Sequence, residues 1–157
     1  MEPTVAGFTT FIRNVMGINT TVLPDDSAVI PMAFNVAMEI VNLDLDLISA
    51  TIYELAVYNL AGSNLLNYAQ DLPEAEPVQG SNPPLPFFEY TRQTWNINGF
   101  VSGVIQASGD EGTNQSLVVQ EAAKNFTLAD LQNLKDPYGR RYLSFAQQYG
   151  PNVWGLV

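Results

Sequence analysis

Apolar residues recur every three or four positions along most of the chain, which is the period of amphipathic helices. A first helix is predicted over residues 4–16, before Gly17, a residue suited to a helix C-terminus. A second is predicted from the Asp-Asp-Ser sequence at 25–27, whose side chains can cap backbone amides, to about Val41. The residues expected to be buried in these two helices are Val5, Phe8, Phe11, Ile12, Val15, Met16, Val29, Ile30, Ala33, Phe34, Ala37 and Val41.

The next helix is predicted over residues 50–70, with Ser49 as its N-terminal cap. Its apolar repeat places Leu55 on the buried face, and the Gly-Ser-Asn sequence at 62–64 is a point where it kinks or ends. Residues 42–47 interrupt the period and form a short loop. Two long helices joined by a short loop predict an antiparallel helical hairpin, the scaffold of the fold.

The middle of the chain is rich in turn-forming residues. Residues 71–86 contain five prolines and predict an irregular surface connection, and residues 87–97 predict an aromatic-rich helix. Residues 99–119 allow two interpretations, a β-hairpin or a helix that ends near Ala107, and the turn formers at 108–114 favour the hairpin. The segment after residue 86 is too short for a core of its own, so residues 1–157 are expected to form a single domain.

The C-terminal part contains two helix starts. Thr127 and Asp130 resemble a capping box, and Asp136-Pro137 places a cap before a proline at the first helical position. The last helix is predicted to end near Tyr149, because Gly150-Pro151 comes after it, leaving residues 150–157 as an extended apolar tail. The predicted fold class is therefore mainly α: an antiparallel helical bundle with a long helical hairpin, an irregular Pro-rich loop, a β-hairpin and an extended C-terminal tail.

The amino-acid composition limits the kinds of catalytic and metal-binding site that the chain can form. The 157 residues include no Cys and no His, so thiolate nucleophiles, Ser–His–Asp triads and His-ligated metals are excluded. No phosphate-binding glycine motif occurs. The acids at 25, 26, 39, 44 and 46 lack the spacing of a calcium loop, and solvated or capping roles explain them better. We therefore expect no catalytic residue, no cofactor site and no metal site, and no signal peptide or membrane span.

Charge is unevenly distributed. The formal net charge is −10, which disfavours binding to nucleic acid or to an anionic membrane. Residues 1–111 carry 13 acidic and 2 basic residues, whereas residues 112–157 carry 3 and 4. Arginine offers a planar, bidentate donor to carboxylates. The residues predicted to contact a partner are therefore the basic pair and the apolar residues after it: Arg140, Arg141, Tyr149, Trp154, Leu156 and Val157.

Several short segments together resemble one family. They are Phe-Thr-Thr-Phe-Ile-Arg at 8–13, Met-Gly-Ile at 16–18, Leu-Pro at 23–24, Leu-Lys-Asp-Pro-Tyr-Gly-Arg-Arg-Tyr-Leu at 134–143 and Trp-Gly-Leu at 154–156. With the helical pair, they resemble the head-to-tail adaptor (connector) proteins of tailed bacteriophages over most of the chain. None of these segments contains a motif for catalysis or for ligand binding.

The resemblance implies a structural virion protein without enzymatic activity, located at the head–tail junction and assembled in the host cytoplasm. It implies self-association into a ring of about twelve copies that contacts the portal protein above and tail or nozzle proteins below. Genomic DNA would pass through the channel without sequence-specific binding, and an acidic wall would repel its phosphates. The alternative from the residues alone is a small carboxylate-dependent enzyme or a ligand-binding domain built around Tyr53, Tyr58, Trp95 and Tyr142.

Overall fold

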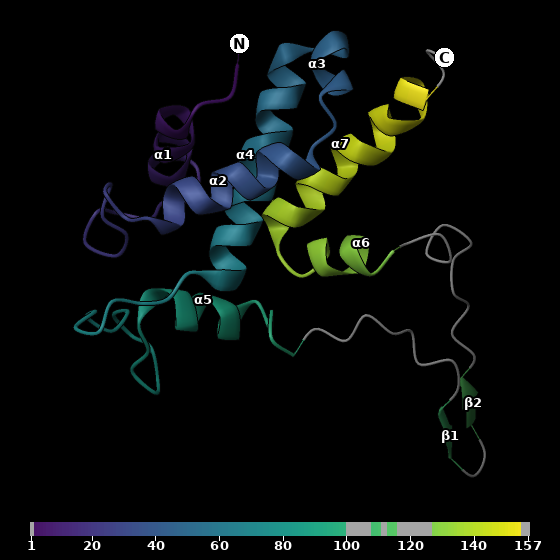
Figure 1. The fold of residues 1–157 in the computed structure, drawn as a ribbon. Coiled ribbons are helices and arrows are strands. Elements are labelled where there is room, and N and C mark those ends of the chain that lie inside the picture. Colours follow the sequence, from purple (N-terminus) through teal and green to yellow (C-terminus); the bar gives the residue numbers. More distant parts are fainter. Residues whose placement is uncertain (1, 100–107, 111–112, 116–126, 155–157) are drawn as a thin grey trace.

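A computed structural model of the chain describes residues 2–99, 108–110, 113–115 and 127–154 (Figure 1). Within these ranges the protein is mainly helical, as predicted. The helices are α1 (Val5–Asn14), α2 (Val29–Ile40), α3 (Asp44–Ile48), α4 (Ala50–Tyr68), α5 (Phe87–Thr94), α6 (Leu128–Asn133) and α7 (Pro137–Trp154), and the two strands are β1 (Ser108–Asp110) and β2 (Thr113–Gln115).

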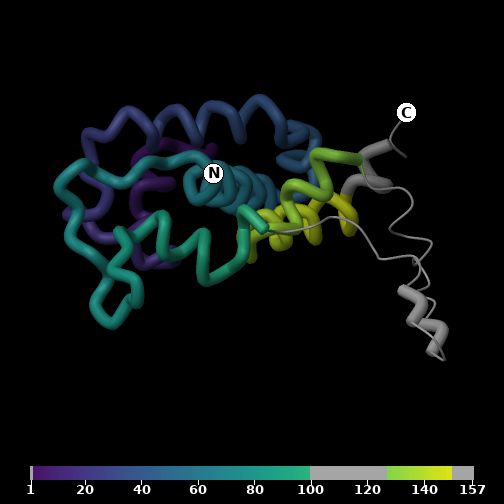
Figure 2. The backbone as a smooth tube through the Cα atoms, turned by 90° about the horizontal axis from the view of Figure 1, so that it is seen from below, coloured from purple at the N-terminus to yellow at the C-terminus, as the bar shows by residue number. Residues whose placement is uncertain are grey.

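Helix α4 is the centre of the molecule. It contacts α1, α2, α3, α5 and α7, and in Figure 2, where it is seen nearly end-on, α2 lies on one side of it and α7 on the other. Helix α2 packs against α4 as predicted, but α3 intervenes between them and α2 runs across α4 rather than alongside it (Figure 1). The arrangement has α4 as a middle layer between α2 and α7.

Helix α1 forms close to the predicted bounds. Thr4 caps it by accepting a hydrogen bond from the Gly7 amide, and Phe8, Phe11 and Ile12 are buried as expected. Val5 and Val15, also expected to be buried, are exposed. The helix ends before Gly17, whose φ of +69° is in the left-handed region that favours glycine.

Helix α2 starts later than predicted, at Val29 rather than at residues 25–27. Residues 25 and 26 form a turn, and the Asp25 carboxylate pairs with the Arg13 guanidinium instead of capping the helix. Arg13 also donates to the carbonyl oxygens of Ile18 (2.8 Å) and Leu23 (2.7 Å). Arg13 therefore holds the α1–α2 connection in place and binds Asp25, one of the residues predicted to cap α2.

Helix α3 was not predicted. The Asn42 side chain accepts a hydrogen bond from the Asp44 amide at 2.9 Å, and Leu45 is buried against the core, which together allow one helical turn where the apolar period breaks. Ser49 then caps α4 as expected, accepting from the Ile52 amide.

Helix α4 has nearly the predicted bounds and continues through residues 62–64, which excludes the end considered there. The prediction for Leu55 is wrong: it is 38% exposed rather than buried between helices. Every residue from Ala56 to Ser63 is buried, because neighbours pack on several sides of this stretch. A helix buried nearly all round carries no clear apolar stripe, so the periodicity could not identify its one exposed edge.

The connection from 69 to 86 is irregular, as predicted, and hydrogen bonds on either side of it cap the start of α5 and the end of α4. The Asp71 carboxylate accepts from the amides of Phe88 (2.8 Å) and Glu89 (3.0 Å) at the start of α5. In return, Arg92 of α5 donates to the carbonyls of Leu66 (2.8 Å) and Ala69 at the end of α4. These contacts fix α5 beneath α4, and α5 ends three residues before the predicted Ile97.

Strands β1 and β2 pair antiparallel, with Ser108 opposite Gln115 and Asp110 opposite Thr113. They occupy the segment that the sequence predicts as the turn. The apolar arms expected to form the hairpin, residues 100–105 and 117–119, lie outside the described residues, so the longer hairpin stays a prediction.

The C-terminal helices begin as predicted and end differently. Thr127 and Asp130 form a complete capping box at α6, and Asp136 accepts from the first amides of α7. Helix α7, however, continues through Pro151 to Trp154, so the end predicted at Tyr149 is wrong. An interior proline costs about 3 kcal/mol through one lost hydrogen bond and a steric clash, which a long, well-packed helix can tolerate. Residues 150–154 therefore do not form the predicted extended tail. Residues 155–157 lie outside the described residues.

Gly7 is required by close packing. A Cβ atom at this position would lie 2.1 Å from the Tyr58 hydroxyl oxygen, which accepts a hydrogen bond from the Thr4 amide. We expect Gly7→Ala to lower the free energy of unfolding by about 1–3 kcal/mol, although alanine is the better helix former. Urea denaturation measures this, and adding Tyr58→Phe should restore part of the loss. A stabilised Gly7→Ala protein would contradict the packing.

Candidate functional site

The most deeply buried ionisable side chain among the described residues is Asp136, which is 0% exposed. One carboxylate oxygen accepts from the amides of Tyr138 (3.0 Å) and Gly139 (2.9 Å), and the other accepts from Ser63 Oγ (2.6 Å) and Asn67 Nδ2 (3.1 Å). With four donors its hydrogen-bonding capacity is filled. The residue therefore joins α7 to α4 and is a structural group, not a reactive one.

The residues predicted to contact a partner fall on one helix as far as they are described. Arg140 and Arg141 are exposed on α7, Tyr149 is half-buried against the core, and Trp154 is the last residue of the helix. Leu156 and Val157 lie outside the described residues. Fourteen positions of one helix separate Arg140 from Trp154, so the structure does not bring these two residues together.

The basic pair is distinctive because other arginines are used internally. Arg13 holds the α1–α2 connection and Arg92 holds the end of α4, where burial lowers its pKa. Among the described residues, Arg13 and Asp25 form an ion pair, and no ion pair involves Arg140 or Arg141. Both of these arginines are exposed and present their charge to solvent. They are available to an acidic partner surface.

Exposed apolar side chains lie in a row along α2, and two more lie on the α3 segment that follows; the five together are called the α2–α3 stripe. Its members are between 45% and 78% exposed, and they are Met32, Val36, Ile40, Leu43 and Leu47. Residues four apart share one face of a helix, so the three α2 members form a line beside the inward face of Ile30, Ala33, Phe34 and Ala37. Soluble monomers rarely expose a contiguous apolar row, which marks this stripe as a candidate interface.

Sequence reasoning missed this stripe, although a signal was present. Helix α2 is apolar on more than one face, and Met32, Val36 and Ile40 have the spacing of a second stripe beside the buried one. A helix that is apolar almost all round is buried on all sides, and in a small protein this indicates a partner.

The acidic residues do not gather into a metal site. No group of three or more acidic side chains with metal-binding geometry occurs in the described part of the chain. Asp44 and Asp46 are exposed in the first turn of α3, where negative charge interacts favourably with the helix dipole. Together with Glu39, which is also exposed, they border the α2–α3 stripe with negative charge.

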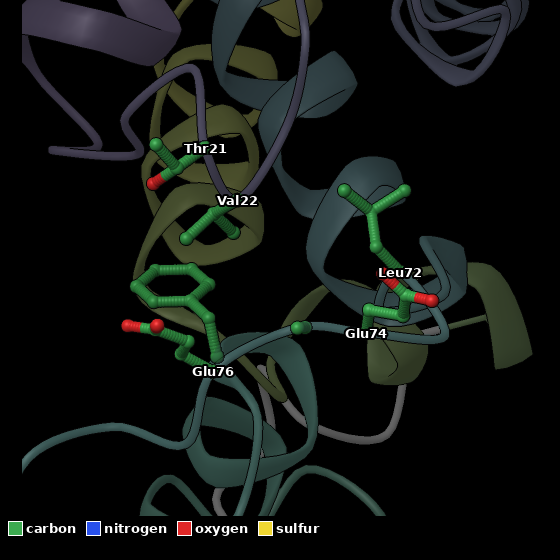
Figure 3. A pocket seen from close by; sticks show the side chains of 7 residues that line it. Thr21, Val22, Leu72, Glu74 and Glu76 are labelled. Atoms are coloured by element: carbon green, nitrogen blue, oxygen red, sulfur yellow. The ribbon is translucent and has the colours of Figure 1, made fainter.

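A pocket of about 380 Å³ lies between the 21–22 loop and the 72–76 segment, with Phe87 beside it (Figure 3). It contains two acids, Glu74 and Glu76. In Figure 3 their carboxylates point to opposite sides of the pocket, and both residues are exposed. This pair therefore lacks the convergence across a bound substrate that carboxylate catalysis requires.

The aromatic residues of the ligand-binding alternative are separated. Tyr53 and Tyr58 belong to the core, whereas Trp95 lines a groove of about 260 Å³ with Tyr90 and Tyr138. That volume is below the usual range of small-molecule sites. Burial raises the pKa of Tyr53, Tyr58, Tyr138 and Tyr142, so these phenols stay protonated and are unsuited to act as bases near neutral pH.

No family model, curated protein or solved structure matches this chain. Among the described helices, none is both long and apolar enough to cross a membrane. Function is therefore inferred from the surfaces described above.

Proposed function

We propose that the chain is a structural virion protein of a tailed bacteriophage, which forms a ring that joins the portal and capsid to the tail. The observation that carries the proposal is the α2–α3 stripe, with three exposed apolar residues on α2, whose other face is in the core, and two more on the α3 segment. Such a row is stabilised when a partner covers it, and in a homo-oligomer the partner is another copy. The resemblance of the sequence to head-to-tail adaptors supplies the biological setting.

The charge of the chain suits a DNA channel. A formal charge of −10 in each copy adds up around a ring, and an acidic wall repels phosphates so that the genome slides without binding. In this role the chain needs no catalytic residue, cofactor or metal. Within the ring we expect about twelve copies, with the polar loops at 71–86 and 106–116 as places of contact with other rings.

The portal is the expected partner of the C-terminal end of α7. Trp154, Leu156 and Val157 are large apolar residues at this end of the chain, and aromatic residues often anchor protein interfaces. We expect deletion of residues 152–157 to leave a folded subunit that no longer captures the portal. Co-purification with the portal protein that we expect the neighbouring reading frames to encode measures capture, and circular dichroism measures folding.

Gln93→Ala, a change at an exposed residue of α5 outside the proposed contact surfaces, is the control and should retain capture. If the deletion unfolds the subunit, the C-terminal residues belong to its own core and not to an interface. If the neighbouring reading frames encode neither a portal nor a major capsid protein, the proposed virion function is contradicted.

A further inference from the structure

The end of the α2–α3 stripe on α3 forms an apolar knob with acidic sides. Leu45 points into the core, and at about 100° per residue Leu43 and Leu47 point away from it. The same rotation places Asp44 and Asp46 on the two sides of that leucine pair. Leu47 is 78% exposed, the most exposed member of the stripe.

A hollow with the complementary character lies between α6 and α7. It has a volume of about 480 Å³ and is open to solvent, and its lining residues are Leu134, Arg140, Leu143, Ser144, Gln147 and Gln148. The two leucines give it an apolar lining, and Arg140, with Arg141 next to it, adds positive charge at the exposed face. Arginine can cover apolar surface with its stem while its guanidinium binds a carboxylate.

Helices α3 and α7 contact one another within one copy, but the knob leucines are not among the residues that line the hollow there. Helix α3 directly precedes the first residue of α4, whereas the start of α7 is bonded to Ser63 and Asn67 near the other end of α4. Fourteen residues of α4 separate Ser49 from Ser63, a rise of about 20 Å. Figure 1 shows α3 at the top of the molecule and α6 well below it. Leu43 and Leu47 are 66% and 78% exposed, so the knob stays uncovered within one copy.

We infer that these surfaces bind one another between copies: the α3 knob of one subunit docks in the α6–α7 hollow of the next, and Asp44 and Asp46 pair with Arg140 and Arg141. Because two different surfaces meet, the contact is head-to-tail and leads to a closed ring or an open filament, not to a two-fold dimer. The inference rests on the proposed self-assembly and identifies the surfaces that would produce it.

Charge reversal tests the pairing. Asp44→Lys with Asp46→Lys places positive charge against Arg140 and Arg141, and Arg140→Asp with Arg141→Asp places negative charge against Asp44 and Asp46. We expect each double variant alone to assemble at least about tenfold more weakly in sedimentation velocity, since like charges at an interface cost more than about 1.4 kcal/mol. An equimolar mixture should recover assembly, because alternating copies restore opposite charges at every junction. Asp26→Lys, at an exposed acid outside the stripe, should assemble like the parent.

Cysteine cross-linking tests the geometry, and the chain has no natural cysteine to interfere. Under oxidation, a chain with both Leu43→Cys and Ser144→Cys should give a ladder of covalent oligomers, and each single variant should stay monomeric on a denaturing gel. A covalent dimer from Leu43→Cys alone would show a two-fold contact and overturn the inference.

The outcomes separate the inference from the proposed function. Rings that form without the ladder, and that resist charge reversal, overturn the pairing of α3 with α6–α7 but leave the ring. A ladder with filaments and no closed rings supports the pairing and contradicts the proposed ring. Chains that are monomeric alone and with the portal, and give no ladder, overturn both.

Discussion

Replacing Asp136 by alanine is expected to destabilise the protein by roughly 3–5 kcal/mol, through loss of a helix cap and exposure of unpaired buried donors. The substitution removes the acceptor for Ser63 Oγ, Asn67 Nδ2 and the amides of Tyr138 and Gly139. Because the site is fully buried, water cannot easily replace the carboxylate. Urea denaturation followed by circular dichroism measures the change.

Asp130→Ala is the matched control for that prediction. Asp130 also bonds at a helix start, where its carboxylate accepts from the Thr127 amide at 2.9 Å, but its site is in contact with solvent. Its loss should cost about 1 kcal/mol. In a double-mutant cycle, Ser63→Ala should cost less in the Asp136→Ala protein than in the parent, because the two side chains share one hydrogen bond. Equal effects of Asp136→Ala and Asp130→Ala would show that the buried junction does not hold α7 to α4.

Truncating Leu65 to alanine is expected to lower the free energy of unfolding by about 2–5 kcal/mol, the usual cost of a buried large-to-small change. Leu65 is 0% exposed on α4, the helix against which the other layers pack. Its removal leaves a cavity among groups held by several helices, so the surroundings cannot collapse to fill it. Thermal or urea denaturation measures the loss.

Leu55→Ala on the same helix is the internal control. The side chain of Leu55 is 38% exposed, and we expect its truncation to cost less than about 1 kcal/mol. The step of ten residues from Leu55 to Leu65 rotates the helix by nearly three turns and leaves the two side chains about 80° apart. A larger loss at Leu55 than at Leu65 would contradict the orientation of α4.

Local signals in the sequence predicted helix positions well where the responsible contact is also local. The Thr127–Asp130 capping box, the Asp136 cap and the Ser49 cap all form within one turn, and each was confirmed. Contacts between distant residues were not predictable. Asp25 is bound by Arg13 from the preceding helix, so the start of α2 moved to Val29 although the local sequence favoured an earlier one.

At the end of α7 the local sequence again predicts the wrong helix boundary, this time an end that comes too early. Gly150 and Pro151 are local helix breakers, yet the helix continues to Trp154. Local propensity is a weak term, and packing of the preceding turns through Leu143 and Phe145 can override it.

The candidate interface was predicted in part. Charge counting identified Arg140 and Arg141, which the structure places on the exposed face of α7. The α2–α3 stripe was missed, because an apolar residue such as Ile40 looks the same in sequence whether the core or a partner covers it. Only the packing of α2 on α4 shows which of its two apolar rows is left uncovered.

Native mass spectrometry with electron microscopy, applied to the chain alone and with the portal protein that we propose as its partner, decides whether the chain forms a ring. We expect closed rings of about twelve copies on the portal, with the α2–α3 stripe between subunits. A variant with Met32→Ser, Ile40→Ser and Leu47→Ser should fold as a monomer and form no ring. Wild-type chains that stay monomeric in the presence of the portal, or rings that form equally well from the serine variant, would contradict the proposed assembly.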